Sequence, residues 1–94
     1  MSDPLSSCPA VTVRFSLEAE AAPGLLPRLL QPFAKRDLTP DFMSSRRDGD
    51  GMRVEIAMAA MPSNMVHLVA GNLRQVVGVR SVAELRTPLL AQAA

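Results

Sequence analysis

Few side chains in this sequence are of a type that could carry out chemistry, and they are scattered along the chain. There is one cysteine, Cys8, and one histidine, His67. Cys8 has no basic residue close to it in the sequence, so it lacks the surroundings that make a thiol reactive. His67 stands between two aliphatic residues beside a helical apolar stripe, which favours the edge of a core over proton transfer or metal binding. We therefore predict neither a nucleophile nor a metal ligand.

The carboxylates form no catalytic set either. Glu18 and Glu20 are close together, but no base or metal-binding residue accompanies them. A single cysteine cannot form an intrachain disulfide, and the Cys-x-x-Cys pair of a soft-metal site is absent. The sequence predicts no catalytic residue, no metal and no cofactor. We therefore expect that the protein is not an enzyme. The alternative that stays open is an enzyme whose catalytic site the sequence does not reveal.

Composition limits the partners of the chain. Hydrophobic residues make up 48% of the 94 residues, charged residues 20%, and the formal net charge is +1. So small a charge favours neither nucleic acid nor an anionic membrane, and three phenylalanines provide no platform for stacking bases. No apolar run approaches the roughly 20 residues of a membrane-spanning helix. We expect a cytoplasmic protein without nucleic-acid or membrane partners.

The length fits one domain, and its strands can be located by alternation. Residues 1–9 and 87–94 lack periodicity, which predicts a flexible arm and a flexible tail around a single domain at 10–86. Apolar and polar residues alternate over 11–17 and 52–58, which predicts two half-buried strands. The Asp-Gly-Asp-Gly sequence at 48–51 predicts a hairpin turn that joins the latter strand to a weaker one at 42–47. A last strand is expected at 79–86.

A first helix is predicted from residue 25 onward. Its apolar stripe consists of Leu25, Leu26, Leu29, Leu30 and Phe33. Pro32 lies within this stripe, where a proline removes one backbone hydrogen bond at a cost of ~3 kcal/mol. We therefore predict a bend or break near Pro32, with the five apolar side chains still buried.

A second helix is predicted after Pro62. Ser63 or Asn64 is the expected N-terminal cap, and Gly78 is the expected end. The apolar positions between them have helical spacing: Val66, Val69, Ala70, Leu73, Val76 and Val77. The order of elements is then strand, helix, two strands, helix, strand. Burying one face of each element gives an α+β, ferredoxin-like βαββαβ fold: a four-stranded antiparallel sheet with two helices on one face.

Residues 23–36 resemble the first loop and helix of ACT domains, most closely those of the small regulatory subunit of acetolactate synthase. The shared pattern is Pro-Gly-aliphatic-Leu-x-Arg, followed by Phe-x-basic-basic. Residues 54–58, the Pro62-Ser63 pair and residues 76–79 are also similar, so that the resemblance covers roughly 10–86. Three positions depart from the pattern. Ala21 replaces a polar residue, Asp37 replaces a glycine but can adopt the left-handed conformation, and Pro40 replaces the aliphatic start of the second strand, where it cannot donate to a ladder.

The resemblance implies an allosteric module that binds a small amino-acid effector at its first loop. The residues carried over to that site are Ala21, Ala22, Pro23, Gly24 and Leu25. A glycine there allows the backbone to approach a ligand closely, and amides at the start of a helix can hold a carboxylate. The expected partner is a larger biosynthetic enzyme subunit.

Two functions from different classes follow, besides the hidden enzyme. The first is a regulatory ACT-like subunit for an amino-acid biosynthetic enzyme, similar to the acetolactate synthase small subunit. The second is a ligand-free ACT-like module that only assembles or docks, and Ala21 favours it. In either case we expect a homodimer, because sheet edges need covering and because Ala57 and Ala59 suggest a flat apolar face.

Overall fold

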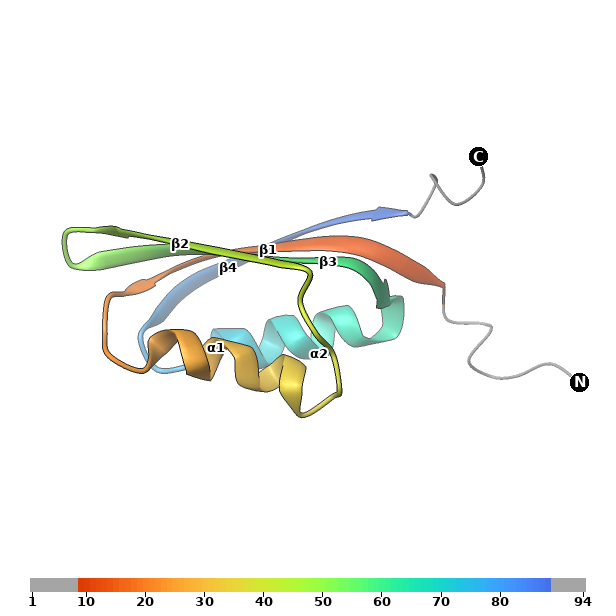
Figure 1. Ribbon diagram of the computed structural model, residues 1–94, viewed down its shortest axis with the longest axis horizontal. Coiled ribbons are helices and arrows are strands. Elements are labelled where there is room, and N and C mark those ends of the chain that lie inside the picture. Colours follow the sequence, from red (N-terminus) through yellow and green to blue (C-terminus); the bar gives the residue numbers. More distant parts are fainter. Residues whose placement is uncertain (1–8, 89–94) are drawn as a thin grey trace, which may run out of the picture.

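The computed structural model describes residues 9–88, which fold into a sheet covered on one side by two helices (Figure 1). The predicted arm and tail fall mostly on residues 1–8 and 89–94, outside the described residues. In chain order the elements are β1 (Ala10–Glu20), α1 (Leu25–Ala34), β2 (Phe42–Asp48), β3 (Gly51–Pro62), α2 (Ser63–Arg74) and β4 (Val79–Pro88). None of the described helices is long and apolar enough to cross a membrane.

The sheet confirms the predicted fold class. Its order is β2-β3-β1-β4, with all neighbours antiparallel. The two central strands are therefore β1 and β3, which are far apart in the sequence and carry the clearest alternation. Both helices cover the same face, as the βαββαβ order requires. The weak strand prediction at 42–47 is also confirmed, as is the hairpin turn, in which Gly49 has a φ of 60°.

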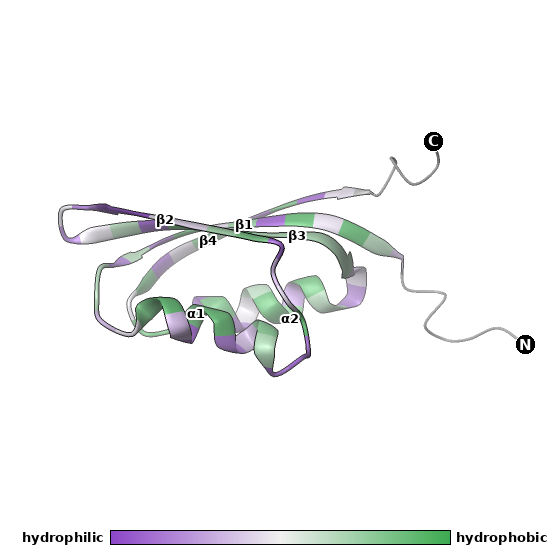
Figure 2. Ribbon diagram, viewed as in Figure 1, coloured by the Kyte–Doolittle hydropathy of each residue, from purple (hydrophilic) through white to green (hydrophobic). Residues whose placement is uncertain are grey.

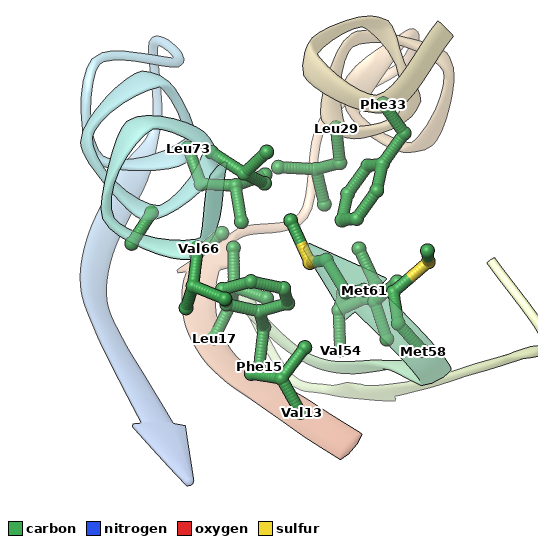
Figure 3. Close-up of a cluster of buried hydrophobic side chains, with 14 of the residues drawn as sticks. Val13, Phe15, Leu17, Leu29, Phe33, Val54, Met58, Met61, Val66 and Leu73 are labelled. Carbon is green, nitrogen blue, oxygen red and sulfur yellow. The ribbon is translucent and has the colours of Figure 1, made fainter. Parts of the chain in front are cut away.

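The core lies between the central strands and the two helices (Figure 3). Phe15 on β1 and Phe33 on α1 are fully buried, and their rings meet edge to face with centroids 5.8 Å apart. That geometry places the positive edge of one ring against the negative face of the other. The other large, fully buried side chains are Leu17, Leu25, Leu29, Ile56, Met61, Leu73, Val13, Val54, Val66 and Val69.

Helix α1 continues through Pro32, so of the two predicted outcomes, a bend or a break, the break does not occur. Its ten residues include Pro32, which is itself buried, and it ends two residues later at Ala34. Pro27 falls in the first turn, where a missing N–H costs little. Three of the five expected apolar side chains are buried, whereas Leu26 and Leu30 are half-exposed at the edge of the stripe. The stripe is thus narrower than predicted.

Helix α2 differs from the prediction at both ends. It begins at Ser63 with Pro62 at the N-cap position, and no side chain caps it. The backbone N–H of Ser63 instead donates to the carbonyl of Pro9, at 3.0 Å, so neither predicted cap is used. The helix ends at Arg74, and Gly78 serves the turn into β4 with a φ of 95°. Val77 is consequently 79% exposed, because the chain has left the helix before reaching it.

The uncovered face of the sheet carries charges beside apolar side chains: Phe42, Ala57 and Leu85 lie in one cross-strand row with Arg14, so the expected apolar surface is interrupted by charge. Arg14 on β1 donates to Glu55 on β3 at 3.0 Å, and Arg53 on β3 donates to Glu18 on β1 at 3.2 Å. Ala57 lies directly opposite Arg14 in the register. Beyond these pairs, the part of β2 near the hairpin is hydrophilic (Figure 2) and exposed.

The Phe15–Phe33 contact predicts the stability of two phenylalanine variants. Phe33→Ala should lower the free energy of unfolding by about 3–5 kcal/mol, because it removes a buried ring and leaves a cavity. Phe42→Ala is the matched control, since this ring is 49% exposed on β2, and it should cost about 1 kcal/mol or less. Urea unfolding followed by far-ultraviolet circular dichroism measures both. Equal losses in the two variants would contradict the core described above.

Candidate functional site

Three loops meet at one end of the sheet, and the first of them contains the predicted ligand site. The backbone N–H of Ala21 donates to the carbonyl of Asp50 in the β2–β3 turn, at 2.9 Å. One residue earlier, the N–H of Glu20 donates to the carbonyl of Gly78 in the α2–β4 turn, at 2.8 Å. The loop between β1 and α1 is therefore fixed at its base by both neighbouring turns.

Gly24 gives this loop its shape. It is the N-cap of α1 and has a φ of 81°, in the left-handed region that a residue with a side chain rarely adopts. A Cβ at this position would lie 3.5 Å from Nη2 of Arg28, so the guanidinium lies beside the bare backbone of Gly24. The loop thus combines an accessible main chain with an adjacent positive charge.

The start of α1 offers fewer hydrogen-bond donors than a typical helix. The N–H of Leu25 donates to the carbonyl of Ala22 at 3.2 Å, which corrects the expectation that this amide is free. Pro27 has no N–H at all. Of the first-turn groups, the N–H groups of Gly24 and Leu26 have no backbone partner outside the helix among the described residues. A carboxylate at this position would rely on these two groups and on Arg28.

The structure brings the five predicted site residues together but does not make them equivalent. Ala22, Pro23 and Gly24 are exposed, and Ala21 is half-buried. The side chain of Leu25 is 1% exposed and belongs to the core, so this residue could contribute only main-chain atoms. The candidate site is therefore a main-chain surface at 21–24.

A second feature, which the sequence analysis did not single out, is an open depression of about 820 Å³ over the hairpin end of the sheet. It contains three arginines and four carboxylates: Arg46, Arg53, Arg80, Glu18, Asp48, Asp50 and Glu55. The predicted loop residues do not line it. The sequence does show that the polar residues of the alternating strands share one face of the sheet. Which of them lie next to one another depends on the order of the strands, which the sequence pattern does not give.

The charges in this depression largely neutralise one another. Arg53 pairs with Glu18, and Arg80 lies 3.9 Å from Glu20. Arg46 lies opposite Arg53 in the β2–β3 register, an arrangement of like charges that is mildly unfavourable. The depression therefore has no strong preference for an anion or a cation.

No metal or nucleophilic centre is found in the part of the chain that the structure describes. No group of three or more His, Cys, Asp or Glu side chains is placed to hold a metal ion within residues 9–88. His67 lies on the exposed side of α2. Cys8 lies outside the described residues.

This architecture defines the class of the protein before any family is considered: a ferredoxin-like α+β module with loops gathered at one end of its sheet. The chain belongs to the ACT-like domain family, whose profile it matches over residues 6–91. ACT domains are typically regulatory modules and not catalytic ones. No curated protein matches the chain.

Solved structures support the fold. The ACT domain of the GTP pyrophosphokinase of Chlorobium tepidum matches with a TM-score of 0.69 and 14% identity, covering 81% of this chain and 99% of that one. A homoserine dehydrogenase from Thiobacillus denitrificans matches with a TM-score of 0.73 and 15% identity, over 89% of this chain and 19% of that one. The regulatory subunit of aspartate kinase from Thermus flavus matches with a TM-score of 0.55 and 13% identity, over 86% and 57%. Identities this low establish the fold alone.

The conformation of Gly24 predicts opposite effects for two Gly→Ala substitutions. Gly24→Ala should lower the free energy of unfolding by about 1–2 kcal/mol, because a side chain disfavours its positive φ. Gly71→Ala should raise it by up to about 1 kcal/mol, because Gly71 is within α2 and a Cβ there meets nothing within 4 Å. Thermal and urea unfolding measure both changes. A stabilising Gly24→Ala would show that the left-handed conformation is not required.

Proposed function

We propose that this chain is a regulatory ACT-like subunit that binds a small amino acid at residues 21–25 and acts on a larger biosynthetic enzyme. The observation that carries the proposal is the left-handed Gly24 at the start of α1 beside the Arg28 guanidinium. A guanidinium and free amides are suitable donors for a carboxylate, and a glycine leaves room for the ligand.

The proposed resemblance to the acetolactate synthase small subunit rests on residues 23–36. The Pro-Gly-Leu-Leu-Pro-Arg sequence contains both residues that shape the loop, Gly24 and Arg28. Asp37, which replaces a glycine of the pattern, adopts a φ of 58°, so the substitution preserves the left-handed turn after the helix. These points favour branched-chain amino acids as the first effectors to test.

A ligand-free docking module is the second candidate, and the same loop favours it. Ala21 lacks the polar side chain found at this position in the resembling family, the Leu25 amide is already engaged, and Pro27 has no N–H. The site would then have lost donors for its ligand. In this case the chain would regulate only by assembly.

Under either candidate we propose that the chain forms a homodimer through the edge of β2. The other edge strand, β4, ends at a proline, which cannot donate to a neighbouring strand. Strand β2 has no proline, and all its residues except Met43 are exposed. Its phenylalanine, Phe42, adds an exposed apolar ring that a second copy would cover.

Amino-acid binding is tested by calorimetric titration of the chain with the twenty amino acids, beginning with valine, leucine and isoleucine. We expect saturable binding of at least one of them. Ala22→Asp should weaken it by about tenfold, because the new carboxylate competes for the same donors. Ala34→Asp, at the other end of α1, is the matched control and should change it by about twofold or less. Absence of heat for all twenty would leave the docking module as the function.

The edge pairing is tested with two serine variants, one on each edge strand. Ser45→Lys on β2 should shift the mass in light scattering from about 20 kDa towards the monomer mass of 10.1 kDa, because it places two cations across a two-fold contact. Ser81→Lys on β4 should leave the dimer intact. Dissociation by Ser81→Lys alone would move the interface to β4, and a monomeric parent chain at high micromolar concentration would exclude the homodimer.

A further inference from the structure

The helix layer of the domain is free of acidic residues. Over 21–36 and 62–79, which include both helices, the sequence has no aspartate or glutamate and four basic residues: Arg28, Lys35, Arg36 and Arg74. The described carboxylates all lie on the strands and in the other connections. The formal net charge of +1 hides this asymmetry. A surface of one sign attracts partners of the opposite sign.

Two of these cations line a groove between α1 and the C-terminal part of α2. Its polar side chains are Arg28 and Gln31 from α1, Asn72 from α2, and the residues that directly follow the two helices, Lys35 and Gln75. Arg28, Gln31 and Lys35 follow one another at i, i+3 and i+7, along about 10 Å of one side of α1 and its C-cap. Each of the five side chains has N–H donors, and none carries a negative charge.

These donors are not neutralised by the protein itself. Neither Arg28 nor Lys35 forms an ion pair with any residue in the described part of the chain. This distinguishes the groove from the depression on the sheet, where four carboxylates accompany three arginines. The groove therefore has an unbalanced preference for an anionic group.

The size of the groove and its buried amide favour a peptide over a free small molecule. Its volume is about 190 Å³, below the roughly 300–1,000 Å³ of pockets that enclose a whole ligand, and suited to one or two acidic side chains. Oδ1 of Asn72 is buried without a hydrogen-bond partner among the described residues. A bound peptide offers backbone N–H groups as donors for this acceptor, whereas an inorganic anion offers at most an acidic O–H.

We propose that the α1–α2 groove docks an acidic segment of a partner protein, whose carboxylates lie along Arg28, Gln31 and Lys35 and whose backbone approaches Asn72. Electrostatic attraction steers the segment, and the contact weakens as salt increases. The groove shares Arg28 with the amino-acid site proposed at residues 21–25, whereas Gln31, Lys35 and Asn72 belong to the groove alone.

The test uses the full chain, labelled with ¹⁵N, and a synthetic peptide of about eight glutamates. Amide shifts in nuclear magnetic resonance spectra should map binding to residues 28–35 and 72–76, and a glutamine peptide of the same length should shift none of them. Lys35→Glu should weaken binding by about fivefold or more by reversing a charge inside the groove. Arg46→Glu on β2 is the matched control, since it makes the same charge change far from the groove, and it should weaken binding by less than about twofold.

Three outcomes would overturn the proposal. One is equal weakening by Lys35→Glu and Arg46→Glu, which would indicate attraction to net charge alone. Another is a map confined to residues 21–25 or to the β2–β3 hairpin. The last is tighter binding of inorganic phosphate than of the glutamate peptide at the same residues, which would make the groove a small-anion site. If a free amino acid shifts the amide signals of residues 21–26 only, this supports the proposed function. It neither supports nor contradicts peptide docking in the groove.

Discussion

The edge-to-face contact between Phe15 and Phe33 is the interaction on which the rest of the domain depends. It joins the central strand β1 to α1, and the domain has only one other aromatic ring, which is exposed. Aliphatic side chains from β3 and α2 complete a single layer of core around this pair. A domain of this length buries a modest apolar area, so a large, well-packed ring at its centre contributes a sizeable share of the stability.

Fixing α1 over β1 also fixes the loop between them. The loop has only four residues between Glu20 and Leu25, and its base is hydrogen-bonded to the β2–β3 and α2–β4 turns. So short a connection leaves the chain little choice of path, and Gly24 supplies the left-handed residue that the path requires. The same packing that stabilises the domain therefore presents the main chain of residues 21–24 to solvent beside Arg28.

The sheet and the helix layer differ in charge, because only the sheet places residues of opposite charge side by side on neighbouring strands. On the sheet, alternation places charged residues on the uncovered face, and antiparallel neighbours allow them to pair across strands, as Arg14 does with Glu55. The charged residues of the helices are all basic, so no such ion pairs form between the helices. The charges of the sheet face are consequently balanced, whereas those of the helix face are positive.

The sequence by itself determined the elements and the class of the fold. Alternation in β1 and β3 and the apolar stripe of α1 are local patterns that indicate which side of each element is buried, and the 48–51 turn is a local pattern that indicates a chain reversal. The Pro-Gly loop likewise located the candidate site. The tertiary structure decided those features that depend on contacts between residues far apart in the chain. Val79 must pair with Ala19, so α2 ends at Arg74 and Val77 is exposed. Strand order brings Glu18 to Arg53, and helix packing brings Lys35 to the same groove as Gln75. No local pattern contains these contacts, because their residues are separated by 35 or more positions in the chain.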